Sequence, residues 1–187
     1  NRSLFKEMSL LPPSSVWKFR PKHPIEKLRY FDPTTWEGQT PLDAATYGEQ
    51  LIETFSRVLP RYFLGGEKVG LSLTGGLDSR MVLAWARQPA GTLPCYTFGG
   101  PYRACADLKL ARILASIASQ PHSTLQIGEN FFSDFASLAR DTVYITDGTM
   151  DVSGAVELYV NSLARSIAPI RLTGNYGSEI LRRNVAF

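Results

Sequence analysis

A nine-residue stretch, SLTGGLDSR at positions 72–80, constrains the fold more than any other part of the sequence. An apolar run, Val69 to Leu73, stops at the pair Gly75–Gly76, and the helix-like segment RMVLAWAR follows. Short apolar runs bounded by turn residues are typical of buried strands, and glycine adopts backbone angles that other residues rarely reach. The stretch therefore predicts a buried strand, a sharp turn and the first turn of a helix.

The same turn has the composition of a binding site for phosphate. Glycines let the backbone approach an anion closely, and the N–H groups and dipole at a helix start favour negative charge. Thr74 and Ser79 add hydroxyl donors. Asp78 would repel a phosphate, so its natural role is to hold a Mg²⁺ ion that bridges to phosphate oxygens. The loop is therefore predicted to bind a nucleotide polyphosphate together with a metal ion.

Strands and helices alternate along the chain after this loop. We expect strands at 69–73, 93–98, 123–127 and 169–174, and helices at 79–87, 107–119, 130–144 and 153–167. This alternation indicates an α/β fold with a doubly wound parallel sheet and helices on both faces. Right-handed crossovers bring the carboxyl ends of parallel strands to one edge, where such sheets bind ligands. Two loops, 74–79 and 173–178, follow strands at that edge.

Residues 1–39 differ from the rest of the chain because they are rich in Pro, Lys and Arg. Two extended pieces, 15–20 and 26–33, predict a hairpin, but no partner for a hydrophobic core is visible within the segment. We therefore expect this part to be the tail of a preceding domain or a linker, and 40–187 to form the main domain. That domain opens with a helix, for which Thr40 is the predicted N-cap.

Composition and charge exclude several classes of protein. A net charge of +3 without a clustered basic run argues against a nucleic-acid partner. No apolar run approaches the ~20 residues that a membrane-spanning helix needs. The N-terminus has no signal-peptide pattern and no initiator Met, so we expect a cytoplasmic protein and a piece of a longer chain. Cys95 and Cys105 lack the spacing of zinc ligands and are expected to be reduced thiols.

The glycine loop differs from the two commonest phosphate-binding motifs. It has no Lys after the glycines, as a P-loop requires, and it lacks the three-glycine spacing of the Rossmann fingerprint. It resembles instead the pyrophosphate-binding loop Ser-Gly-Gly-Leu-Asp-Ser of the N-type ATP pyrophosphatases. Residues 74–79 read Thr-Gly-Gly-Leu-Asp-Ser, so five of the six match and the Thr keeps the hydroxyl.

Segments further along resemble the synthetase domain of glutamine-dependent asparagine synthetases and their relatives, the β-lactam synthetases among them. CYTFGG is similar to the second strand of that family, DLKLARILASIA to the helix after it, PHSTLQI to its third strand and RLTGNYGSEIL to its last loop. The resemblance covers 40–187 and implies the fold of a PP-loop ATPase. The segment from LLPPSSVW to RYFDPTTW resembles the end of a glutaminase domain and its linker.

The resemblance implies roles for individual residues. The first loop would hold pyrophosphate, with Asp78 as the metal ligand, through Thr74, Gly75, Gly76, Asp78 and Ser79. Leu73 and Phe98 would flank adenine, and Thr173 and Gly174 would contact the ribose or the α-phosphate. Asp78, Asn175 and Glu179 stand at the positions of catalytic residues. The cofactors implied are ATP and Mg²⁺.

The chemistry implied is ATP-dependent amide formation. A carboxylate, from aspartate or a related acid, would attack the α-phosphorus of ATP and release pyrophosphate. An amine, or ammonia from a glutaminase domain outside this chain, would then displace AMP. Asn175 and Ser178 replace a Glu and an Asp of the family pattern, which weakens the case for asparagine formation itself. A nucleotide-binding module without turnover therefore stays open as the alternative, and tRNA modification by a related pyrophosphatase is a weaker one.

Overall fold

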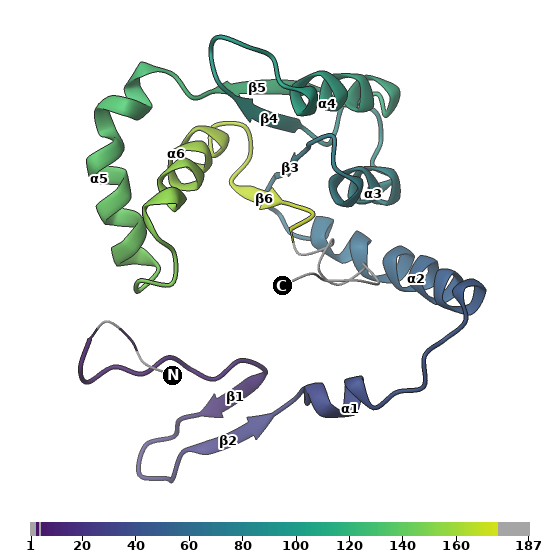
Figure 1. The fold of residues 1–187 in the computed structure, drawn as a ribbon. Coiled ribbons are helices and arrows are strands. Elements are labelled where there is room, and N and C mark those ends of the chain that lie inside the picture. Colours follow the sequence, from purple (N-terminus) through teal and green to yellow (C-terminus); the bar gives the residue numbers. More distant parts are fainter. Residues whose placement is uncertain (1–2, 4, 176–187) are drawn as a thin grey trace.

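The structure of the protein is a computed structural model that describes residues 3 and 5–175. Its N-terminal part is a hairpin that stands apart from the sheet domain in Figure 1. β1 (Ser15–Lys18) pairs antiparallel with β2 (Glu26–Arg29), so the predicted hairpin is confirmed. A short helix, α1 (Pro33–Glu37), leads from it towards the main domain.

The main domain opens with α2 (Ala44–Val58), which continues into a 3₁₀ turn, η1 (Leu59–Phe63). The N-cap of α2 is Asp43, so the prediction of Thr40 is wrong. The Asp43 carboxylate accepts hydrogen bonds from two backbone N–H groups and from the Thr46 hydroxyl. The Thr46 bonds hold the pKa of Asp43 below its ordinary value. The helix therefore starts at the acid because its carboxylate satisfies donors of the first turn.

A four-stranded parallel sheet forms the centre of this domain. Its strands, in the spatial order β5-β4-β3-β6, are β5 (His122–Gln126), β4 (Cys95–Gly99), β3 (Val69–Ser72) and β6 (Ile170–Leu172). Its helices are α3 (Leu77–Ala86), α4 (Ala106–Ile117), α5 (Glu129–Ile145) and α6 (Ala155–Ala164), with a 3₁₀ turn η2 (Val152–Gly154) before α6. Each predicted strand and helix up to Leu172 is present, with ends shifted by a few residues.

Helices cover both faces of the sheet (Figure 1). The odd-numbered residues of β3 and β4 pack with α3 and α4 in the main core, which contains Leu71, Leu73, Val82, Leu83, Cys95, Ala111 and Ala115. The even-numbered residues point the other way, since side chains alternate along a strand. There the Arg171 side chain of β6 bonds to Ser72 of β3 and to Glu157 of α6. The predicted doubly wound α/β fold is confirmed.

Cys95 belongs to the apolar core. It is 1% exposed, and burial raises the pKa of its thiol to about 11. The thiol therefore stays protonated and packs as a small apolar side chain.

The strand order creates a switch point beside β3. The chain moves from β3 to β4 and β5 on one side, and then returns to place β6 on the other side. β4 and β6 thus flank β3 on opposite sides, and a strand order that reverses in this way places a crevice at the carboxyl ends of the strands. Both loops singled out in the sequence, 74–79 and 173–178, begin at this crevice.

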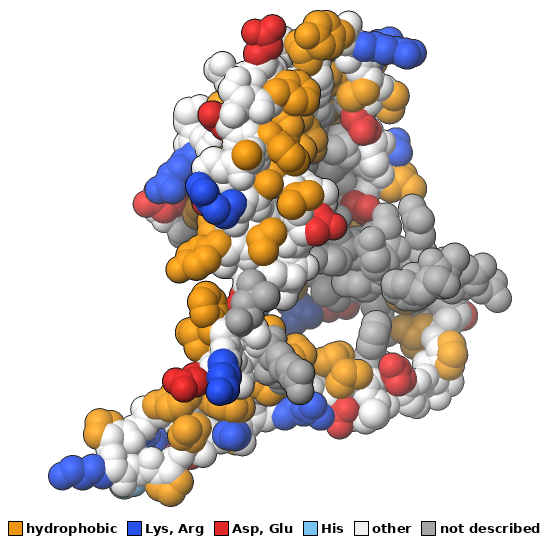
Figure 2. Space-filling model, turned by 60° about the vertical axis from the view of Figure 1, so that its left-hand side comes forward, with side chains coloured by type: hydrophobic (Ala, Val, Ile, Leu, Met, Phe, Trp, Pro, Cys, Tyr) orange, Lys and Arg blue, Asp and Glu red, His pale blue; other side chains and the backbone are white. Residues whose placement is uncertain are grey.

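The outer face of α5 carries exposed apolar side chains, and hydrophobic atoms gather on this side of the molecule in Figure 2. They include Phe132, Phe135, Tyr144 and Ile145. The ring of Phe5, from the N-terminal segment, packs edge-on against Tyr144 with centroids 6.4 Å apart. Within the described ranges, no helix combines the length and apolar character that crossing a membrane requires.

Candidate functional site

A cavity of about 460 Å³ lies at the switch point. This volume falls within the range of roughly 300–1,000 Å³ that is typical of ligand sites. The cavity is lined by Ser72, Thr74, Gly76, Asp78, Ser79, Phe98, Glu157, Arg171, Thr173, Gly174 and Asn175. The lining therefore combines the glycine loop, the end of β4, the first turn of α6 and the end of β6.

Hydrogen bonds around Ser79 hold the glycine loop in shape. The Ser79 hydroxyl lies 3.0 Å from the Thr74 hydroxyl, and it accepts a hydrogen bond from the Thr74 N–H at 3.1 Å. The Thr74 hydroxyl in turn accepts from the Gly76 N–H at 3.1 Å. Two hydroxyls thus close the turn onto the start of α3.

The start of α3 supplies the N–H groups that an anion needs. Its N-cap is Gly76, which offers no side chain, and the first helical hydrogen bond runs from the Arg80 N–H to the Gly76 carbonyl. The first-turn N–H groups of a helix have no carbonyl partner within the helix. Together with the helix dipole they favour an anion in the cavity.

Gly75 contacts α4 and faces away from the cavity. Its N–H donates to the Asp107 carboxylate of α4 at 2.9 Å, and it does not line the cavity. A Cβ atom here would lie 2.7 Å from the Leu110 side chain. A larger residue at 75 would push the exposed Leu110 side chain aside and loosen the packing of the loop on α4.

The second loop packs directly on the first. A Cβ atom on Gly174 would lie 2.7 Å from the Asp78 carbonyl carbon and from the Ser79 nitrogen. The Thr173 hydroxyl accepts a hydrogen bond from the Asn175 N–H at 3.1 Å, which turns the chain at this point. The loop after β6 and the start of α3 therefore share one wall of the cavity, and glycine is required where their backbones meet.

The ladder between β3 and β4 stops at the site. The Leu71 N–H donates to the Pro94 carbonyl and the Leu73 N–H to the Tyr96 carbonyl, each at 2.9 Å. The next donor in this series is the Gly75 N–H, which bonds to Asp107 instead. The N–H that would continue the ladder to the Phe98 carbonyl is therefore used by α4, and Phe98 itself lines the cavity.

A chain of hydrogen bonds crosses the sheet at the same level. The buried Thr97 hydroxyl donates to the Leu73 carbonyl at 2.6 Å, and His122 Nε2 lies 2.9 Å from the same hydroxyl. Because the hydroxyl proton goes to Leu73, the imidazole nitrogen must donate to Thr97. Burial lowers the pKa of His122, and the nearby Arg112 lowers it further. These hydrogen bonds fix Leu73, the residue between β3 and the glycine loop.

Most residues predicted for the site meet in this cavity. Those that line it are Thr74, Gly76, Asp78, Ser79, Phe98, Thr173, Gly174 and Asn175. Leu73 is fully buried and Gly75 lies behind the loop, so both support the wall. Glu179 and Ser178 lie outside the described residues.

Sequence reasoning missed three lining residues. Arg171 donates through Nη1 to Glu157 and to Asn161 (2.9 Å), and through Nη2 to Ser72 (3.2 Å). The Arg171 side chain is 20% exposed and that of Glu157 is 41% exposed. The available signal was the charged residue inside the short apolar strand PIRLTG, since a strand covered on both faces rarely carries an arginine without a specific partner.

A metal ion in this cavity would need ligands from the phosphates of a nucleotide as well as from the protein. Among the residues that the structure describes, no group of three or more His, Cys, Asp or Glu side chains could hold a metal ion. Of the lining residues that the structure describes, Asp78 alone brings a carboxylate to the glycine-loop side of the cavity. One carboxylate fits Mg²⁺, because this ion is commonly bound by one or two carboxylates together with substrate phosphates.

Comparison with protein families identifies the domain. The model of the asparagine synthase family matches residues 53–182, which is more than half of the chain. The chain belongs to the asparagine synthase family. This is a family of ATP-dependent amide-forming ligases, and the predicted resemblance is confirmed at that level. The matched range contains both loops of the cavity. A comparison with the sequences of curated proteins gives no match.

Two solved structures are similar to this asparagine synthase-family chain. One is an NH₃-dependent NAD synthetase from Campylobacter jejuni in complex with nitrate, with 15% identity and a TM-score of 0.42 over 64% of this chain and 49% of that one. The other is an NMN synthetase from Francisella tularensis, with 18% identity and a TM-score of 0.43 over 71% and 54%. The chain thus spans about half the length of these structures.

Proposed function

We propose that this chain binds Mg-ATP at the β3–β6 switch point and transfers the adenylyl group to a carboxylate. The carboxylate belongs to aspartate or a related acid, and an amine or ammonia then displaces AMP to form an amide. The observation that carries the proposal is the joining of the glycine loop, the uncapped start of α3 and Gly174 in one cavity.

The polyphosphate fits the α3 side of the cavity. The helix dipole, the first-turn N–H groups and the Thr74 hydroxyl favour anionic oxygens there. The Ser79 hydroxyl proton is directed to the Thr74 and Gly76 carbonyls and holds the loop in shape. The Gly75 amide already bonds to Asp107, so the groups left for phosphate come from the start of α3. Asp78 would hold the magnesium ion, which neutralises charge on the leaving pyrophosphate.

The adenine fits the interrupted ladder beside β4. The Phe98 carbonyl faces the position where another strand residue would donate, and the Phe98 side chain lines the cavity. An amino group of a base can take the place of that missing donor. Leu73, whose carbonyl is held by Thr97, supports the base pocket from beneath.

A carboxylate oxygen forms a bond to the α-phosphorus, and the bond from this phosphorus to the bridging oxygen of pyrophosphate breaks. The nitrogen nucleophile then attacks the acyl carbon, loses a proton, and AMP leaves. The main contribution of the protein would be electrostatic stabilisation of the leaving pyrophosphate by prearranged N–H and hydroxyl donors.

The alternative is a module that binds nucleotide without turnover. Asn175 favours it, since this residue lines the cavity as a neutral amide where the family pattern has a carboxylate. The complete glycine loop favours the enzyme. Both forms of the proposal share the nucleotide site and differ only in the adenylation step.

The wider organisation belongs to the same proposal. Residues 1–39 would be the tail of a glutaminase-like domain or a linker, and 40–187 the N-terminal part of the ATP-binding synthetase domain. A glutaminase domain outside this chain would supply ammonia, in a protein of the cytoplasm.

Exchange of labelled pyrophosphate into ATP tests the proposal directly. The chain should catalyse this exchange only with Mg²⁺ and only with a suitable carboxylate, when aspartate, glutamate and other amino acids are offered in turn. Calorimetry with Mg-ATP, without any acid, measures binding separately. Binding without exchange for every acid would favour the non-catalytic module, and an absence of binding would refute the nucleotide site.

A further inference from the structure

The Glu157–Arg171 pair is a charged group in the cavity for which adenylation chemistry alone gives no role. It lies on the α6 face of the sheet, as does Phe98, because Phe98 and Ser72 both belong to the even-numbered set of β4 and β3. The phosphate-binding loop opens instead at the start of α3. The pair and Phe98 therefore line the part of the cavity that a nucleoside would occupy.

Arg171 is held too firmly to capture a mobile anion. Both protons of Nη1 are used by Glu157 and Asn161, and one proton of Nη2 is used by Ser72. Its charge is already balanced by the Glu157 carboxylate. A substrate carboxylate would have to displace Glu157, which makes this guanidinium a poor receptor for the acid to be activated.

The pair keeps unused hydrogen-bonding capacity. The Glu157 carboxylate binds Arg171 through Oε2, and Oε1 accepts no hydrogen bond from the described residues. The Arg171 Nε is buried and has no partner among those residues. Buried polar groups are nearly always hydrogen-bonded in folded proteins. The neighbouring guanidinium disfavours a cation at Glu157, so a neutral N–H or O–H donor suits its free oxygen best.

We propose that Glu157 and Arg171 recognise the nucleoside part of the nucleotide, a specificity role that rests on the function proposed above. Glu157 Oε1 accepts a hydrogen bond from a donor of the nucleoside, either the amino group of the base or a ribose hydroxyl. Arg171 is a positioning residue, which orients the carboxylate. The amino group of the base and the ribose hydroxyl would both donate to the same oxygen, and nucleotide analogues distinguish between them.

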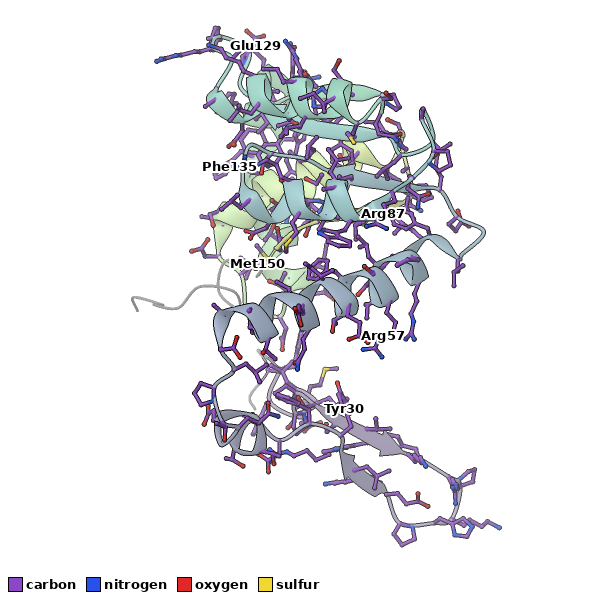
Figure 3. The ribbon with its side chains drawn as sticks, turned by 90° about the vertical axis from the view of Figure 1, so that its right-hand side faces the viewer. Tyr30, Arg57, Arg87, Glu129, Phe135 and Met150 are labelled. Atoms are coloured by element: carbon purple, nitrogen blue, oxygen red, sulfur yellow. The ribbon has the colours of Figure 1, made fainter. Side chains whose placement is uncertain are left out.

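Calorimetry with five Mg²⁺-loaded probes tests this role: ATP, ITP, 2′-deoxy-ATP, 3′-deoxy-ATP and pyrophosphate. Glu157→Gln should weaken ATP binding about 10- to 100-fold, the range for loss of a hydrogen bond to a charged group. Pyrophosphate should bind as before, because it occupies only the loop. Glu129→Gln is the matched control, since Glu129 is also an acid in the first turn of a helix and lies at the outer end of the domain in Figure 3.

The nucleotide analogues identify the donor. If it is the amino group of the base, Gln presents an N–H that suits the 6-oxo group of ITP, and the preference for ATP over ITP should reverse in Glu157→Gln. If it is a ribose hydroxyl, ATP and ITP should weaken together, while the deoxy analogue that lacks this hydroxyl binds equally to both proteins. Either pattern supports the proposal.

Three results would count against it in distinguishable ways. Unchanged ATP affinity in Glu157→Gln, or equal weakening of ATP and pyrophosphate, overturns the recognition role and leaves the nucleotide site intact. Failure of the unmodified chain to bind either probe refutes the proposed function itself. If Glu157→Gln does not fold, Asn161→Ala is the second variant, because Asn161 is exposed and accepts a hydrogen bond from Arg171. Loss of this bond should weaken ATP binding about two- to ten-fold and leave pyrophosphate binding unchanged.

Discussion

The two sides of the cavity are built in different ways. The glycine-loop side comes from consecutive residues, 74–79, whose hydroxyls and amides bond to one another. The opposite side joins Ser72, Glu157 and Arg171, with Glu157 and Arg171 more than eighty residues from Ser72 in sequence. The first side is a local motif, and the second exists only after the sheet and α6 have assembled.

This difference separates geometry from charge. The loop side depends on close backbone contacts that only glycine permits, as at Gly174. The Glu157–Arg171 side depends on an ion pair with partial exposure, which water and neighbouring groups can partly replace. Substitutions should therefore have severe effects on the glycine-loop side and smaller, graded effects on the Glu157–Arg171 side.

Gly174→Ala should have the largest effect. The new Cβ would lie 2.7 Å from backbone atoms of Asp78 and Ser79, which cannot move without shifting the start of α3. We expect a loss of about 3 kcal/mol in unfolding free energy, the upper end for overpacking, and loss of both ATP and pyrophosphate binding. Urea unfolding and calorimetry would measure the two effects.

Gly66→Ala is the control for this substitution, because nothing lies within 4 Å of a Cβ atom at that position. It should leave nucleotide binding unchanged. Normal pyrophosphate binding by Gly174→Ala would show that the two loops do not need their close contact.

Arg171→Met should have an intermediate effect. It leaves the Glu157 carboxylate without its ion-pair partner, a change that costs about 3–5 kcal/mol for a fully buried pair. The Glu157 side chain is 41% exposed and can be hydrated, so we expect only about 1–2 kcal/mol. Urea unfolding provides the measurement, and the double variant Glu157→Gln/Arg171→Met should recover part of the loss. Additive losses would mean that the pair contributes no coupling.

Much of the fold could be predicted from the sequence because its signals are local. The apolar runs of β3 and β4 are bounded by glycine or proline, and helical spacing marks α4 and α5. The start of α2 was misplaced, since Thr40 and Asp43 are both good caps by residue type. The choice between them depends on which side chain reaches the first-turn N–H groups, as Asp43 does.

The two sides of the cavity also differ in how well the sequence predicts them. The glycine loop could be predicted because its chemistry lies within six consecutive residues. The Glu157–Arg171 side could not, because register decides it: β6 pairs with β3 so that Arg171 shares a face with Ser72, and α6 brings Glu157 to them. The role of Asp107 could not be predicted for the same reason, since its hydrogen bond joins α4 to Gly75 of the glycine loop, which is distant in sequence.

Thr97→Val should have a smaller effect on stability and a selective one on the site. The variant keeps the shape of the side chain but leaves the buried Leu73 carbonyl and the His122 N–H without this partner. We expect a loss of about 1 kcal/mol, by thermal unfolding, and a larger loss of affinity for ATP than for pyrophosphate. Thr92→Val, at an exposed hydroxyl, is the control. Equal weakening of both ligands would argue against a link between this chain of bonds and the base pocket.

The smallest expected effect is a pH dependence through His122. Its pKa in the folded protein is lowered, first by burial and then by Arg112, so the unfolded chain binds the proton more readily. Stability from this group is therefore fully present above the ordinary histidine pKa of about 6.5, and it is lost as the pH falls from there towards the lowered value. Protonation does not break the bond to Thr97, because both the neutral and the charged ring donate from Nε2.

Melting temperatures between pH 5 and pH 8 should fall less steeply towards acid in His122→Gln than in the unmodified chain. His23→Gln, in the exposed turn between β1 and β2, controls for the removal of a histidine as such. Parallel curves of melting temperature against pH for His122→Gln and the unmodified chain would show that protonation of this ring does not change the stability of the fold.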